Sequence, residues 1–283
     1  MKTIDMVMAT THVDLHSTRF TRESLEVAAK HLRGRYIPLL AEHDLLRPLG
    51  RVLGATVRQR PDGEWELAVK GELLEADNDT VPIHPGREFR VSRPKQAGLR
   101  LVAGDEFIRD PASRGVLKEF AGVLRNPVEF EGRRALEPPD LIKLAGIYLL
   151  GKVAEGFLSE LGADGYVSLK RVMARLFASR IGPTKERRLC VEIYFDREGV
   201  EAILIQSNPT PESTDAMLTT GLQELDAILP GLLSSIPDVR RVVAEFRSDG
   251  VRVVYIVGAD CLPREVRRST DRGEKRDDWE SQP

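Results

Sequence analysis

The sequence predicts an α+β protein, and three observations lead to this prediction. Along the segments of the N-terminal part, apolar residues alternate with polar ones, which indicates strands with one wetter face. After residue 135, helix-length segments are mixed with pairs of apolar runs joined by turns, the pattern of a layered α+β domain. The length of 283 residues fits two domains of about 150 residues each. We therefore expect a β-rich domain with helices over 1–135, an α+β domain over 136–262 and a disordered charged tail over 263–283.

The N-terminal part contains a series of short strand candidates and two helix candidates. Thr21 is placed as the N-cap of a helix that runs to Leu32. A Pro-Asp-Gly sequence at 61–63 supplies the turn of a long hairpin. A second helix is expected over Gly115 to Leu124. The strand candidates are Ile4 to Thr10, Tyr36 to Leu40, Leu49 to Gln59, Trp65 to Leu74, Glu88 to Ser92 and Gly98 to Ala103.

The C-terminal part alternates helices with hairpins. Asp140 is expected to cap the first helix, and a Gly-Pro pair at 182–183 follows the second. The expected helices are Asp140 to Leu161, Val167 or Ser168 to near Ile181, and Ser213 or Asp215 to Leu229. The expected hairpins pair Leu189 to Phe195 with Val200 to Gln206, and Val239 to Arg247 with Val251 to Ala259.

The composition excludes several functional classes. The chain has 42 Lys and Arg against 44 Asp and Glu, a formal net charge of −2, whereas a dedicated nucleic-acid binder needs an excess of cations. The most apolar stretch, Leu141 to Leu161, carries both Lys and Glu, so we expect no membrane span. No secretory signal precedes it, which predicts a cytoplasmic protein. Cys190 and Cys261 lie far apart and are expected to be buried, reduced thiols.

Histidines are the candidate catalytic residues, and His43 is the best placed. It follows the apolar strand Tyr36 to Leu40 and precedes a Pro-Leu-Gly turn at 48–50. A half-exposed imidazole at the end of a strand suits a general base near neutral pH. His12 and His16 flank an acid but have no third ligand nearby, and His84 lies in a Pro-rich loop. We expect no metal and no cofactor.

Three segments around His43 occur in an order that resembles a known family. They are DLHSTRFTRESL at 14–25, IPLLAEHD at 37–44 and PLGRV at 48–52, followed by the hairpin with Asp62-Gly63 at its turn. This order resembles the prohead (capsid maturation) serine proteases of tailed phages over roughly residues 5–75, about a quarter of the chain. The resemblance implies a barrel-like fold in which a His and a Ser on adjacent strands form the catalytic pair.

On this resemblance His43 is the general base and Ser92 is the nucleophile. The imidazole would take the hydroxyl proton as the serine attacks a peptide carbonyl. Backbone N–H groups after Ser92, or Arg93 or Arg100, would stabilise the oxyanion. The sequence departs from the family's pattern at Pro94, which has no N–H to donate. The third, orienting residue stays open between Asp105, Glu106 and Asp110.

Two functional hypotheses follow from these residues. The first is a serine endopeptidase that cleaves a protein partner or itself through the His43–Ser92 pair. The alternative is a catalytically inactive, protease-like fold that acts as a binding or assembly module, which the Ser92-Arg-Pro sequence favours. Amphipathic helices at 140–180 are compatible with a partner protein or a second copy of the chain. A metal-dependent nuclease is disfavoured because the sequence has no acidic cluster for metal ions.

Overall fold

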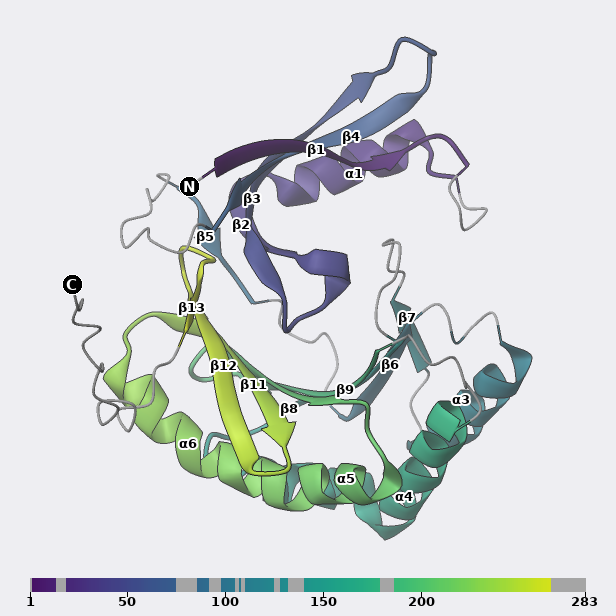
Figure 1. Ribbon diagram of the computed structural model, residues 1–283, viewed down its shortest axis with the longest axis vertical. Helices are drawn as coiled ribbons and strands as arrows, with labels where there is room; N and C mark the ends of the chain where they lie inside the picture. Colours follow the sequence, from purple (N-terminus) through teal and green to yellow (C-terminus); the bar gives the residue numbers. More distant parts are fainter. Residues whose placement is uncertain are drawn as a thin grey trace, which may run out of the picture.

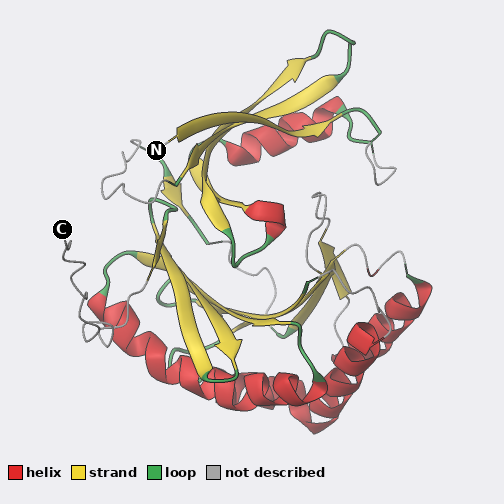
Figure 2. Ribbon diagram, viewed as in Figure 1, coloured by secondary structure: helices red, strands yellow, loops and turns green. Residues whose placement is uncertain are grey.

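The computed structural model describes residues 2–13, 19–74, 86–91, 98–104, 107, 110–124, 128–131, 140–178 and 186–265, and they form two open sheets with helices (Figures 1 and 2). The smaller sheet has five strands in the order β1-β4-β3-β2-β5. Its strands are β1 (Lys2–Thr10), β2 (Arg35–Leu40), β3 (Pro48–Gln59), β4 (Trp65–Leu73) and β5 (Glu88–Phe89). Pairing is antiparallel except between β2 and β5, which run parallel.

Helix α1 (Arg22–Leu32) covers one face of the small sheet. Thr21 begins it, because its hydroxyl accepts a hydrogen bond from the Ser24 amide at 3.2 Å. Its apolar side packs on alternate residues of β4 and on two residues of β3 that lie on either side of a register shift after Val52. The buried members of this core are Leu25, Ala29, Leu32, Val52, Ala55, Leu67 and Val69.

The larger sheet has eight strands in the order β13-β12-β11-β10-β9-β8-β6-β7. The pairs β6/β7, β8/β9 and β10/β11 are parallel, and the other pairs of this sheet are antiparallel. The strands are β6 (Arg100–Gly104), β7 (Val128–Glu131), β8 (Asp140–Ile147), β9 (Arg187–Phe195), β10 (Val200–Ser207), β11 (Val239–Arg247), β12 (Gly250–Gly258) and β13 (Pro263–Glu265).

Helices cover one face of the large sheet and leave the other face toward the small sheet (Figure 2). They are α3 (Pro111–Leu124), α4 (Val153–Ala178), α5 (Pro211–Ala216) and α6 (Leu222–Ser235), with a π-helical turn at Met217–Gly221 between the last two. Gly162, at φ +66°, interrupts α4. The largest apolar core lies between these helices and the sheet, and includes Phe120, Phe157, Phe195 and Leu204.

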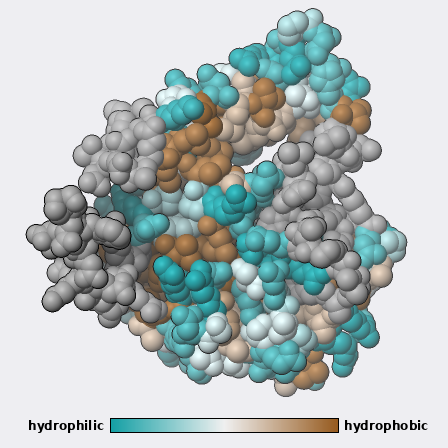
Figure 3. Space-filling view, viewed as in Figure 1, coloured by the Kyte–Doolittle hydropathy of each residue, from teal (hydrophilic) through white to brown (hydrophobic). Residues whose placement is uncertain are grey.

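The opposite face of the large sheet contributes to a second core together with the small sheet. Tyr36, Leu53 and Phe89 come from the small sheet, and Cys190 and Ile203 are among their partners from the large one. In the space-filling view, apolar side chains gather on both sides of this junction (Figure 3). The two sheets therefore pack against each other through one apolar core.

The structure confirms the α+β content and corrects parts of the sequence prediction. Residues 140–147 form a central strand, β8, and not the start of a helix, which begins only at Val153. The described strands of the small sheet form an open sheet with edges at β1 and β5, so the barrel expected from the resemblance is not closed. The boundary near residue 135 stays a prediction, although β6 and β7 from before it join the large sheet. Pro263–Glu265 forms β13, and the rest of the tail lies outside the described residues.

Candidate functional site

His43 lies in a tight loop between β2 and β3. The chain leaves β2 through a 3₁₀ turn, η1 (Ala41–His43), and the Ala41 amide donates to the Arg47 carbonyl at 2.9 Å. Glu42 and His43 both have positive φ, +50° and +57°. A left-handed conformation costs a non-glycine residue roughly 1–3 kcal/mol and persists only where the surroundings impose it. Contacts beyond the loop must therefore hold it.

These contacts come from the large sheet. Asp44 is 3% exposed, and its Oδ2 accepts a hydrogen bond from Nη2 of Arg188 on β9 at 3.0 Å. Its Oδ1 accepts from the Leu46 amide at 3.0 Å. The Tyr255 hydroxyl on β12 donates to the Leu45 carbonyl at 2.7 Å. Asp44 thus anchors the loop to the sheet, and the side chain of His43 projects from it into an exposed position.

Ser92, the predicted nucleophile, lies outside the described residues, as do Arg93 and Pro94. The strand that leads to it is described. In β5, Phe89 stands opposite Tyr36 in parallel register, and its amide donates to the Ala259 carbonyl at 2.6 Å. Because β2 and β5 are parallel neighbours, the chain leaves both strands in the same direction.

The described residues beside the two candidates contact one apolar cluster. Val91 directly precedes Ser92, and Leu45 and Leu46 follow His43. All three are partly buried against the core shared by the two sheets. The sequence neighbours of both predicted catalytic residues are thus anchored on the same surface.

The other residues considered for catalysis have structural contacts or are not described. Arg100 on β6 pairs with Glu129 on β7, with Nη1 3.2 Å from Oε2. Asp110 caps α3, because its carboxylate accepts from the Ser113 amide at 3.0 Å. Asp110 is therefore occupied by the helix end, and Asp105 and Glu106 lie outside the described residues.

Of the two histidines that could suit a metal ion, His12 and His16, only His12 lies in the described part of the chain. His12 contacts Asp62 across the small sheet, with its Nε2 3.1 Å from Oδ2, whereas Asp14, His16 and His84 are not described. No group of three His, Cys, Asp or Glu side chains that suits a metal ion occurs in the described part of the chain. In the same part, no helix is both long enough and apolar enough to span a bilayer.

Both cysteines are buried, as the sequence predicts. Cys190 and Cys261 lie in the core shared by the two sheets. Burial raises the pKa of the Cys261 thiol to about 12. Because a thiolate is the reactive form, this thiol is a poor nucleophile at neutral pH.

Buried ion pairs surround the junction of the sheets. Arg51 is fully buried, donates from Nε to Glu72 Oε2 at 2.7 Å and lies 4.3 Å from the ring centre of Tyr36. On the large sheet, Arg241 pairs with Glu201. Burial raises the pKa of the Glu201 carboxyl, and the Arg241 charge opposes this rise. These buried ion pairs add directional polar contacts to the apolar core between the sheets.

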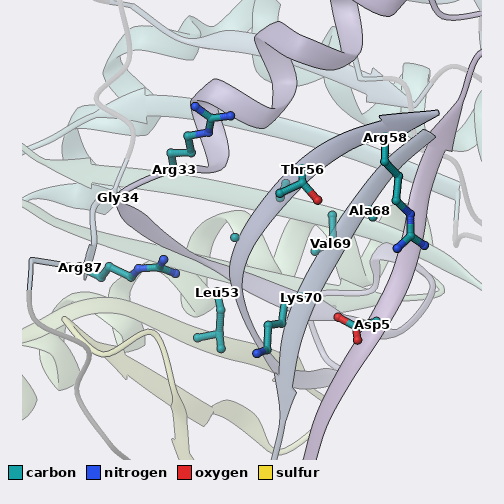
Figure 4. Close-up of a pocket in the computed structure, with 12 residues that line it drawn as sticks. Asp5, Arg33, Gly34, Leu53, Thr56, Arg58, Ala68, Val69, Lys70 and Arg87 are labelled. Atoms are coloured by element: carbon teal, nitrogen blue, oxygen red, sulfur yellow. The ribbon is translucent and has the colours of Figure 1, made fainter. Parts of the chain in front are cut away.

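A groove that sequence reasoning did not predict is formed by strands of the small sheet together with the segments that follow α1 and precede β5 (Figure 4). Its volume is about 660 Å³, within the range of about 300–1,000 Å³ typical of ligand sites. We call it the basic groove, and it is lined by Asp5, Arg33, Gly34, Leu53, Gly54, Ala55, Thr56, Arg58, Ala68, Val69, Lys70 and Arg87. The alternation in β4 places Lys70 on the polar face, but only the sheet order brings it near Arg33 and Arg87.

Comparison with known proteins gives no match at a significant level, whether with family models, curated proteins or solved structures. Functional arguments therefore depend on the residues themselves.

Proposed function

We propose that the protein is a serine endopeptidase that resembles phage prohead maturation proteases, with His43 as general base and Ser92 as nucleophile. The observation that carries the proposal is the parallel pairing of β2 with β5, in which Tyr36 stands opposite Phe89. It supports a catalytic pair built by two neighbouring strands, the arrangement that the sequence resemblance implies.

The His43 loop supports this role through its rigidity. A general base needs a fixed position relative to the hydroxyl that it deprotonates. The Asp44–Arg188 pair and the Tyr255 hydrogen bond to Leu45 hold the loop in a strained backbone conformation and leave the imidazole accessible. Strain of this kind is often found at functional sites.

The proposed reaction has two steps. Ser92 Oγ forms a bond to the substrate carbonyl carbon while His43 accepts the hydroxyl proton, and this proton then passes to the amine that leaves as the C–N bond breaks. Water, deprotonated by the same imidazole, then attacks the acyl carbon, and the proton returns to Ser92 Oγ as the ester C–O bond breaks. Because Pro94 has no N–H, other donors must stabilise the oxyanion. The substrate is a protein partner or the chain itself.

Labelling of the full chain with a fluorophosphonate probe tests the proposal. The wild type should label, peptide mass spectrometry should locate the label on Ser92, and Ser92→Ala and His43→Ala should abolish it. The matched controls, Ser234→Ala and His31→Ala, change exposed residues of helices and should label normally. Failure of the folded wild type to label or to cleave itself or a co-expressed partner would instead support the inactive binding module that Pro94 favours.

A further inference from the structure

The basic groove collects cations from segments that are distant in the sequence. Arg33 follows α1, Lys70 lies on β4 and Arg87 precedes β5. In the close-up, Arg33 and Arg87 extend toward β3 from one side, while Lys70 and Asp5 come from the adjacent strands (Figure 4). A Cβ at Gly54 on β3 would lie 3.8 Å from the Arg87 Nη1 atom, an ordinary contact distance, which places the Arg87 guanidinium over this part of β3.

The charges of the groove are only partly compensated. Arg58 pairs with Glu66, at 2.5 Å between Nε and Oε1. Among the described residues, Arg33, Lys70 and Arg87 form no ion pair with a carboxylate. Asp5 is the acidic side chain among the lining residues. The groove therefore presents a local excess of positive charge on a chain whose formal net charge is −2.

We propose that the basic groove binds an acidic, extended peptide segment of a partner protein. Two of its uncompensated cations are arginines, whose planar guanidinium groups bind carboxylates in a bidentate manner. Between these charges, Leu53 and Ala68 add apolar surface for small side chains. The combination of cationic and apolar lining matches a peptide with alternating acidic and small residues.

The lining distinguishes this ligand from a nucleic acid. Single-stranded nucleic acids are bound by aromatic side chains on which the bases stack, and the lining residues of the groove include none. Asp5 would also repel a continuous phosphate backbone. An acidic peptide avoids both problems because its charges are spaced by neutral residues.

The groove and the described neighbours of the predicted catalytic residues contact the same core. Leu53 lines the groove and also belongs to the core against which Leu45 and Val91 pack. Arg87 lies five positions before Ser92. A segment bound in the groove would therefore lie near the start of the strand that leads to the nucleophile. That the bound segment belongs to a substrate rests on the proposed peptidase function, whereas the binding itself does not.

Fluorescence anisotropy with the full-length Ser92→Ala chain tests the binding. The probe is a fluorescein-labelled peptide of alternating Glu and Ala, and the reference is the same peptide with Gln in place of Glu. The Glu peptide should bind, and Lys70→Glu/Arg87→Glu should weaken it at least about tenfold, since each charged hydrogen bond contributes substantially. The control Lys118→Glu/Arg252→Glu makes the same charge change at exposed positions elsewhere and should bind as before.

Each outcome separates the two proposals. Three results would overturn the peptide assignment. The Glu and Gln peptides could bind equally, the control variant could weaken binding as much as the groove variant, or a single-stranded oligonucleotide could bind more tightly at the groove. If the double reversal does not fold, Lys70→Gln replaces it, with the same expected direction. Fluorophosphonate labelling of the groove variant in the Ser92-containing chain should persist. If the folded wild type does not label, the proposed peptidase function is refuted. If the Glu peptide produces no rise in anisotropy, the proposed peptide binding in the groove is refuted.

Discussion

Replacement of Arg51 by Met should destabilise the whole molecule, because this arginine joins the two sheets from a fully buried position. Its guanidinium pairs with Glu72 at 2.7 Å, and its Nη1 donates to the Asp260 carbonyl at 2.8 Å. Methionine replaces the aliphatic part of the side chain but has no charge and no donor. The substitution removes the guanidinium that faces the carboxylate of Glu72, which is 6% exposed.

The expected loss in the free energy of unfolding follows from this burial. Removal of one partner from a buried ion pair costs about 3–5 kcal/mol, because the remaining charge is neither solvated nor compensated. Total stabilities are about 5–15 kcal/mol, so the loss is a large fraction. Removal of both charges should cost much less, and Arg51→Met/Glu72→Leu should recover about 2 kcal/mol or more relative to Arg51→Met.

Urea denaturation followed by far-UV circular dichroism measures these differences. The control is Arg175→Met, which removes an exposed ion pair to Glu119, with 55% of each side chain accessible. Such a pair contributes about 1 kcal/mol or less. Two results would refute the assignment of Arg51 as a structural link. One is a loss of unfolding free energy in Arg51→Met that equals the loss in the control. The other is a double variant whose loss equals the sum of the losses of its two single variants.

Three other substitutions test separate parts of the structure. Gly50→Ala should cost about 4 kcal/mol or more, because a Cβ would lie 1.9 Å from a carbonyl oxygen of β4; Gly63→Ala, in an open turn, should cost about 1 kcal/mol, and equal denaturation midpoints would contradict this. Asp44→Asn should lower the midpoint and slow fluorophosphonate labelling, since it removes the charge that faces buried Arg188; an unchanged rate would show that the loop needs no anchor. Burial raises the pKa of Cys261 from 9.0 to about 12, so the free energy of unfolding should fall as the pH rises above 9, where only the unfolded chain ionises this thiol. Cys261→Ala should reduce that fall in pH-dependent denaturation, and an unaltered pH dependence would contradict its burial.

Local sequence signals predict much of the small sheet. Pro-Asp-Gly at 61–63 and the alternation in β4 indicate the long hairpin, and the Thr21 hydroxyl caps α1 as expected. These features depend on residues close in the sequence, so short-range patterns suffice to find them. The order of the strands depends on distant pairings such as β2 with β5, for which no local signal exists.

The misassigned helix at 140–147 shows how position in a sheet overrides local preference. Leu, Ala and Lys in this segment favour a helix, and Asp140 resembles an N-cap. In the structure the segment is β8, with neighbours on both sides and mostly buried residues. A strand covered on both faces has a nearly continuous apolar sequence, which periodicity does not separate from a buried helix.

The candidate site was predictable only in part for the same reason. His43 stands out by its place after an apolar strand, but the partner of Asp44 is Arg188, far away in the sequence. Asp44 is 3% exposed, and its carboxylate pairs with the large sheet, a contact that no local pattern in the sequence indicates. The basic groove has no sequence signature, because Lys70 and Arg87 become neighbours only through the fold.

The contacts of the His43 loop assign a role to the C-terminal half of the chain. Arg188 and Tyr255 belong to the large sheet, yet they bind Asp44 and the Leu45 carbonyl in the loop of the small sheet. A loop with two residues at positive φ is not stable by its own interactions. The loop that carries His43, the proposed base, therefore depends on the large sheet for its conformation. In this arrangement the C-terminal half is part of the scaffold of the site, in addition to any partner that it binds.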